Sequence, residues 1–122
     1  MSARRILIVE DDADIREALA EAMSEAPGAE VIVAVDGLDA LERLRDGPRP
    51  AVILLDLRMP RLSGQELLDL LRADPRYEDL PVITMTAGIG RAEADDIVAH
   101  LQKPVDLDDL RRIVESLFDA AA

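Results

Sequence analysis

The sequence predicts an α/β fold in which a doubly wound parallel β-sheet carries helices on both faces. Short aliphatic runs alternate along the chain with segments whose apolar residues recur at helical spacing. The aliphatic runs are continuously apolar, which is typical of parallel strands that are buried on both faces. The 122 residues are enough for one core, and we expect a single domain over residues 1–122.

The first half of the chain contains three predicted strands and two predicted helices. The strands cover residues 5–10, 31–35 and 51–56. The first helix has apolar residues at helical spacing over residues 15–23, with Asp14 and Glu17 as its capping pair, and ends at Pro27-Gly28. Leucines at positions 38, 41 and 44 mark the second helix, which ends at Gly47.

The second half contains two more strands, over residues 81–87 and 99–102, and two helices with clear start signals. Ser63 and Glu66 form a capping box for a helix that ends before Pro75. Asp106 caps the last helix, whose apolar residues continue at helical spacing to Phe118. Between the last two strands we expect a further helix to be short or absent, confined to residues 91–97.

Composition excludes several classes of function. The net charge of −12 argues against direct nucleic-acid binding, and the absence of cysteine excludes disulfides and thiolate metal sites. One tyrosine and one phenylalanine provide no aromatic platform for stacking a base or a sugar. The sequence has no signal-peptide pattern and no apolar run approaching the ~20 residues of a membrane span. We therefore expect a cytoplasmic protein with no membrane partner.

Polar residues gather where the predicted strands end. The first strand ends at Glu10 and Asp11, the third at Asp56, the fourth at Thr86 and the fifth at Lys103. The carboxyl ends of parallel strands share one edge of the sheet, where ligands bind. If the first and third strands are neighbours, the acids converge, and two carboxylates ~5 Å apart repel by ~3 kcal/mol at an effective dielectric of 20. Mg²⁺ would relieve this repulsion.

These groups together indicate phosphoryl chemistry. A carboxylate, a hydroxyl, an ammonium and Mg²⁺ are suited to hold a phosphoryl group on Asp56. Lys103 is the only lysine in a chain with thirteen arginines, and a planar guanidinium would be a poor substitute for a compact ammonium. Each feature alone has an ordinary structural explanation, such as a helix cap. Their joint placement at successive strand ends supports a site.

Four segments resemble the receiver domain of two-component response regulators, and the resemblance runs from Arg4 to Phe118. ILIVEDD resembles the family's first strand and acidic pair, and LLDLRMPRLSG its phosphoacceptor segment. PVITMTA resembles the strand that ends in a phosphate-contacting threonine and alanine, and LQKPV the Lys-Pro pair that often has a cis peptide bond. The resemblance implies a flavodoxin-like sheet of five strands in the order 2-1-3-4-5.

The resemblance also implies a Mg²⁺ site. By position, Asp11 would bind the ion directly together with Asp56, and Glu10 would act mainly through a metal-bound water. The backbone carbonyl of Arg58 would be a further protein ligand.

The phosphoryl group itself would lie on Asp56, the phosphoacceptor implied by the resemblance. Thr86 would donate its hydroxyl and Ala87 its backbone N–H to phosphoryl oxygens, and Lys103 would pair with another of these oxygens.

A signalling switch is the function that the resemblance implies. The phosphoryl donor would be a phosphohistidine of a sensor histidine kinase or of a histidine phosphotransfer protein, and a conformational change would relay the state to a downstream protein. The protein would catalyse only its own phosphorylation and dephosphorylation, and so would not be an enzyme acting on other substrates. The sequence leaves open whether the chain acts alone or belongs to a longer regulator.

The chain departs from the family's pattern before Lys103. The segment between Thr86 and Lys103 is shorter than usual, and His100 occupies the place where a Tyr or Phe usually reports phosphorylation. His100 is either a partly exposed strand residue without a switch role or an imidazole switch coupled to Thr86 and sensitive to pH. The second interpretation requires that His100→Ala change phosphorylation-dependent partner binding.

Particular residues bear on three other interpretations. A receiver-fold interaction module that works without phosphorylation stays open. A hydrolase of the haloacid dehalogenase type generally has a second acid two residues after its nucleophile, where this chain has Arg58. A flavodoxin-like cofactor binder needs a Gly- or Ser/Thr-rich loop after the first strand, where the acids at positions 10–12 would repel a phosphate.

Overall fold

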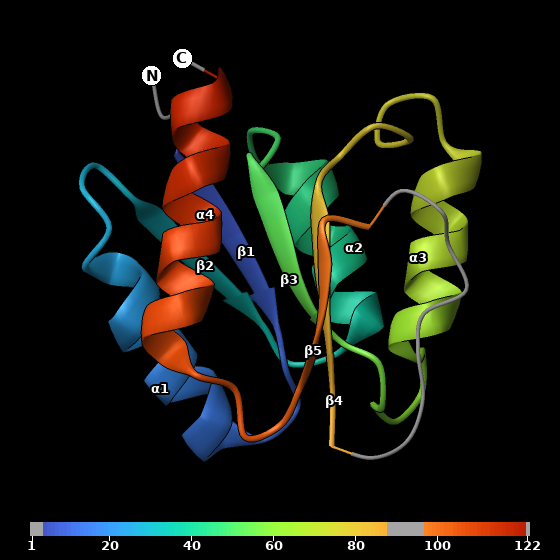
Figure 1. Ribbon diagram of the computed structural model, residues 1–122. Helices are drawn as coiled ribbons and strands as arrows, with labels where there is room; N and C mark the ends of the chain where they lie inside the picture. Colours follow the sequence, from blue (N-terminus) through green and yellow to red (C-terminus); the bar gives the residue numbers. More distant parts are fainter. Residues whose placement is uncertain (1–3, 88–96, 122) are drawn as a thin grey trace.

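A single five-stranded sheet organises the protein, whose computed structural model describes residues 4–87 and 97–121 (Figure 1). The strands are β1 (Arg5–Val9), β2 (Glu30–Ala34), β3 (Val52–Asp56), β4 (Val82–Thr86) and β5 (Ala99–Gln102). They are arranged in the order β2-β1-β3-β4-β5, and every neighbouring pair is parallel. The predicted doubly wound α/β fold and its strand order are confirmed.

Helices cover both faces of the sheet. Helices α1 (Ala13–Ser24) and α4 (Leu107–Ala121) lie on one face, and α2 (Gly37–Asp46) and α3 (Gly64–Ala73) lie on the other (Figure 1). Side chains alternate between faces along a strand, so Ile6 and Ile8 of β1 pack towards α1 and α4, while Leu7 and Val9 pack towards α2 and α3. This two-sided burial explains why the strands are continuously apolar in sequence.

Two predicted helix starts are confirmed. Ser63 and Glu66 form a capping box at α3, because the Ser63 hydroxyl accepts from the backbone of Glu66 and the Glu66 carboxylate accepts from the backbone of Ser63. Asp106 precedes α4, and its Oδ1 accepts a hydrogen bond from the backbone N–H of Asp109 at 3.0 Å. Both caps satisfy backbone donors that the helix itself leaves unpaired.

The predicted start of α1 is wrong by two residues. Asp12, rather than Asp14, is the N-cap, and its Oδ1 accepts from the backbone N–H groups of Asp14 and Ile15 at 2.9 and 3.1 Å. Asp12 has an extended backbone, so the first helical residue is Ala13. Several acids precede the helix, and the spacing of its apolar residues does not show which of them caps it.

The connection between β4 and β5 is described only at its ends. The short helix expected over residues 91–97 lies outside the described residues except for Ile97, which is not helical and packs against the core beneath α2 and α3. None of the described helices has the length and the hydrophobicity needed to cross a lipid bilayer.

Candidate functional site

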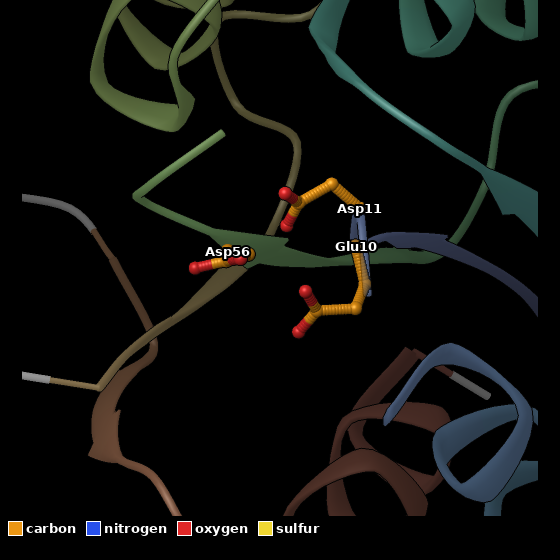
Figure 2. A group of neighbouring side chains, drawn as sticks. All are labelled: Glu10, Asp11 and Asp56. Atoms are coloured by element: carbon orange, nitrogen blue, oxygen red, sulfur yellow. The ribbon is translucent and has the colours of Figure 1, made fainter. Parts of the chain in front are cut away.

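Three carboxylates meet beyond the carboxyl ends of β1 and β3 (Figure 2). These strands are neighbours, with Val9 paired in register with Leu55, so Glu10 and Asp11 leave β1 beside Asp56. Each of the three acids offers one oxygen, and these oxygens lie within 4.8 Å of one another. Figure 2 shows the side chains facing a common space. The predicted convergence of the acids is confirmed.

Glu10 is fully buried, whereas Asp11 is exposed. The Oε2 atom of Glu10 accepts a hydrogen bond from the backbone N–H of Asp12 at 3.2 Å. Burial raises the pKa of Glu10 from its ordinary value of 4.5 to about 7, with the nearby charge of Asp56 adding to the rise and Lys103 partly offsetting it. The negative charge at this position is therefore only partly compensated by the protein.

Lys103 supplies the cation of the cluster. Its Nζ lies 2.6 Å from Oε1 of Glu10, as an ion pair rather than a well-aligned hydrogen bond, and 3.3 Å from Oδ2 of Asp56. Burial acts to lower the pKa of Lys103, but the two carboxylates outweigh it and raise the pKa above its usual range. The backbone N–H of Lys103 donates to the carbonyl of Thr86 at 2.8 Å, and the Lys103–Pro104 peptide is cis, as the resemblance implies.

Asp56 is the last residue of β3 and only 3% of its surface is exposed. Its Oδ1 accepts a hydrogen bond from the backbone N–H of Arg58 at 3.1 Å, while its Oδ2 faces Lys103. The following loop, residues 57–63, returns directly onto the end of the strand. A Cβ atom at Gly64 would lie 2.2 Å from the Asp56 carbonyl oxygen, and the Gly64 N–H donates to the carbonyl of Leu57 at 3.1 Å.

Thr86 and Ala87 lie at the end of β4, which pairs with β3. Thr86 is buried, and its partner in register is Gln102, the residue before Lys103. Ala87 is exposed and, together with Lys103, lines a largely apolar cavity of about 420 Å³. Topology thus brings both residues to the edge of the sheet that carries Asp56, and their contacts with a phosphoryl group stay predictions.

His100 makes a contact that the sequence alone does not predict. The register of β4 and β5 places it opposite Thr84, and its Nδ1 lies 2.7 Å from the Thr84 hydroxyl oxygen. Nε2 is buried and has no hydrogen-bond partner among the residues that the structure describes. Coupling of His100 to Thr86 stays a prediction.

An ion pair between a buried carboxylate and an exposed guanidinium of the 57–63 loop is also not predicted by the sequence. Asp36, at the start of α2, pairs with Arg61 of the loop. The two residues are 25 positions apart, and nothing in their spacing links them. Only the packing of α2 beside the carboxyl end of β3 brings them together.

The donor set fits a hard divalent cation. Mg²⁺ prefers carboxylate, carbonyl and water oxygens, and the three clustered acids provide oxygens close enough to share one ion. Burial raises the pKa of Glu10 even with Lys103 beside it, and a divalent cation at the three acids would favour the charged form of this carboxylate. The carbonyl of Arg58 as a ligand stays a prediction.

Comparison with known proteins identifies the family. The model of the response regulator receiver domain matches residues 6–115. The chain belongs to this family. The receiver domain is 38% identical over 114 residues to the response regulator MprA of Mycobacterium sp. (strain KMS), covering 87% of this chain and 46% of that protein. It therefore spans about half the length of the curated relatives it matches.

Solved structures agree with this assignment. A sensor protein from Polaromonas sp. JS666 superposes on this receiver domain with a TM-score of 0.85 at 28% identity, covering 98% of both chains. The Mn²⁺-bound form of response regulator Rcp1 has a TM-score of 0.76 at 28% identity, covering 93% of this chain and 91% of that one.

Proposed function

We propose that this receiver domain is a signalling switch that accepts a phosphoryl group on Asp56. Receiver domains of response regulators act in phosphorylation-dependent signalling, and the family match supports that role here. The observation that carries the assignment of Asp56 is its position at the centre of the site. It is a buried carboxylate with the Lys103 ammonium 3.3 Å from one oxygen and two further acids beside it.

The proposed transfer forms one bond and breaks one. A carboxylate oxygen of Asp56 attacks the phosphorus of a phosphohistidine, and the N–P bond breaks with its electron pair returning to the imidazole nitrogen. Lys103 exchanges its contact with the Asp56 carboxylate for a phosphoryl oxygen. The Thr86 hydroxyl and the Ala87 N–H donate to the other oxygens, which places donors where charge gathers during the transfer.

The cofactor in this proposal is Mg²⁺, which would neutralise charge on the phosphoryl oxygens. Asp11 and Asp56 would bind it directly, the Arg58 carbonyl would be a further ligand, and Glu10 would act mainly through a metal-bound water. The raised pKa of Glu10 and the spacing of the three acids support this assignment. The Mn²⁺-bound form of Rcp1 shows that a related receiver-type structure holds a divalent cation.

The partners follow from the same proposal. A sensor histidine kinase or a histidine phosphotransfer protein in the cytoplasm would donate the phosphoryl group, and a downstream protein would recognise the phosphorylated state. Water would later hydrolyse the acyl phosphate and reset the switch. The protein would thus act catalytically only on its own Asp56, without direct nucleic-acid or membrane contacts.

Intact-mass spectrometry after incubation with Mg²⁺ and acetyl phosphate tests the assignment. We expect the wild-type protein to gain one phosphoryl group and Asp56→Asn to gain none, because the amide has no nucleophilic carboxylate oxygen. Equal labelling of the Asp56→Asn variant would show that another residue is modified. A wild type that stays unlabelled, also with a phosphorylated histidine phosphotransfer protein as donor, would favour an interaction module that works without phosphorylation.

A further inference from the structure

The loop between β3 and α3, residues 57–63, is attached to the start of α2 by a buried carboxylate. Asp36 is the N-cap of α2 and is 3% exposed. Its Oδ1 accepts a hydrogen bond from the backbone N–H of Asp39 at 2.8 Å, and its Oδ2 accepts one from Nη2 of Arg61. One carboxylate oxygen therefore caps the helix, and the other binds the loop.

Arg61 has a backbone conformation that residues other than glycine rarely adopt. Its φ of 66° lies in the left-handed region, where a Cβ atom crowds the backbone. Glycine would adopt this turn at lower cost. An arginine here combines an unfavourable backbone conformation with an ion pair that only a long cationic side chain can form with Asp36.

The next residue of the loop packs against the same helix. A Cβ atom at Gly37 would lie 2.8 Å from the carbonyl oxygen of Leu62 and 2.9 Å from its Cβ. Glycine at the first position of α2 thus allows the loop to approach closely. The loop is fixed to α2 at two consecutive residues, Arg61 and Leu62.

The opposite end of the loop reaches the candidate metal site. Arg58 lies three residues before Arg61, its N–H donates to Oδ1 of Asp56 at 3.1 Å, and its carbonyl is the expected Mg²⁺ ligand. Gly64 closes the loop by donating to the carbonyl of Leu57. With the ends and the middle attached, the conformation at Arg58 depends on the attachment at Arg61.

We propose that the Asp36–Arg61 ion pair is a positioning element of the Mg²⁺ site. It holds the loop so that the Arg58 carbonyl and the Asp56 carboxylate bind the same ion, and neither Asp36 nor Arg61 touches the metal. This role rests on the proposed function in that Mg²⁺ is the cofactor. Groups that orient metal ligands contribute to affinity without binding the metal themselves.

The test is the Mg²⁺ dissociation constant, measured by calorimetry and by NMR titration of the Arg58 amide. Arg61→Gly removes the guanidinium and suits the positive φ, while Asp36→Asn keeps an oxygen for the N-cap. We expect each to weaken Mg²⁺ binding about threefold to tenfold, and the double variant to bind no more weakly than the weaker single one. Arg61→Lys, which keeps a cation, should recover part of the affinity.

Arg49→Ala is the matched control. It removes an equally charged, partly exposed guanidinium that pairs with Asp79 at 2.9 Å, away from the acids. Its Mg²⁺ affinity should match the wild type, which separates positioning from a change in net charge. Thermal unfolding in EDTA provides the second readout. Arg61→Gly should melt near the wild-type temperature, because glycine adopts the positive φ at lower cost and this gain offsets the loss of the ion pair.

Unchanged Mg²⁺ affinity in both Arg61→Gly and Asp36→Asn would overturn the inference, as would a wild type that binds no Mg²⁺. The proposed function fails separately. If the wild type binds Mg²⁺ and the variants bind it more weakly, but Asp56 is never phosphorylated, the positioning role stands and the phosphoacceptor assignment does not.

Discussion

The carboxylate of Glu10 combines full burial with a position beside a second acid. Lys103, 2.6 Å away, balances part of its charge but also faces Asp56. Burial and the charge of Asp56 therefore dominate, and the pKa of Glu10 rises to about 7. The charge state of this one residue links pH to folding and would link it to the proposed binding of Mg²⁺.

In metal-free buffer we expect the free energy of unfolding to fall as pH rises from about 5 to about 8. The folded pKa of Glu10, about 7, lies above its ordinary 4.5, so the folded state holds this proton more tightly. The resulting stabilisation is complete below about pH 4.5 and is lost as pH rises through about 7. Glu10→Gln should remove a fall of about 1–3 kcal/mol, measured by urea denaturation in EDTA across this range.

Glu17→Gln is the control for this measurement. Glu17 is an exposed acid on α1, so its substitution should leave the pH dependence of unfolding unchanged. If Glu10→Gln retained the wild-type dependence on pH, burial of Glu10 would not be its source.

Among single residues, the sequence predicts those whose chemistry is unusual for the chain and whose place is a strand end. Lys103, the only lysine, meets both conditions, and Asp56 meets the second. His100 is the only histidine of the chain but lies within β5, and its contact with Thr84, 16 positions earlier, depends on the register between two strands. Asp36 and Arg61 were missed for the same reason, since only the packed arrangement of α2 and the loop joins them.

At the scale of elements, the start of α3 has two roles. It ends the loop after Asp56, and its first residue, Gly64, touches the backbone of the strand that carries Asp56. A side chain at this position would push the helix away from β3. The loop can adopt this geometry because Gly64 has no Cβ atom.

Gly64→Ala should destabilise the fold by about 3 kcal/mol or more, because overpacking against backbone leaves little room for adjustment. The added Cβ would lie 2.2 Å from the Asp56 carbonyl oxygen and 2.6 Å from Cα of Leu57. Urea denaturation measures the loss. In the control Gly47→Ala, the nearest atom is the end of the Arg5 side chain at 3.0 Å, which can move, so the expected change is within about 1 kcal/mol.

The start of a helix was predicted correctly where a capping residue stands directly before it. The capping box at Ser63 and the cap at Asp106 mark α3 and α4 correctly, because each acceptor stands alone before its helix. At α1 the acids at positions 10, 11, 12 and 14 compete, and the helix begins after Asp12, whose side chain accepts from the backbone N–H groups of Asp14 and Ile15.

On the scale of the whole molecule, binding of the proposed Mg²⁺ would be coupled to folding through the cluster of acids. The folded chain brings the adjacent residues Glu10 and Asp11 together with Asp56, which lies far from them in the unfolded chain. A cation that binds only the folded form must raise stability. It also favours the charged form of Glu10, which opposes the fall in stability at high pH.

Mg²⁺ at tenfold excess over its dissociation constant should add about 1.4 kcal/mol to the free energy of unfolding and raise the melting temperature by about 5 °C. The rise should be larger at pH 8 than at pH 6, because protonated Glu10 competes with the cation below about pH 7. Calorimetric melting with and without EDTA measures both effects. A rise of equal size in Asp11→Asn would place the ion elsewhere.

The overall arrangement of the chain was predictable because the alternation of buried strands and amphipathic helices allows few topologies. The strand order then follows from the family resemblance, and the structure confirms it. What the pattern does not contain is the set of contacts between elements, such as Leu62 on Gly37. These contacts determine how precisely the loop after Asp56 is positioned at the site.

The position of β5 sets a limit on how long the site stays assembled. β5 is the last strand of the sheet, only four residues long, and none of its residues is fully buried, whereas every residue of β3 and β4 is. Short outer strands open locally at a lower free-energy cost than central ones. Lys103 follows β5 directly, so each opening removes the ammonium while Asp56 stays in place. The pairing of β5 with β4 is therefore what keeps the ammonium beside Asp56.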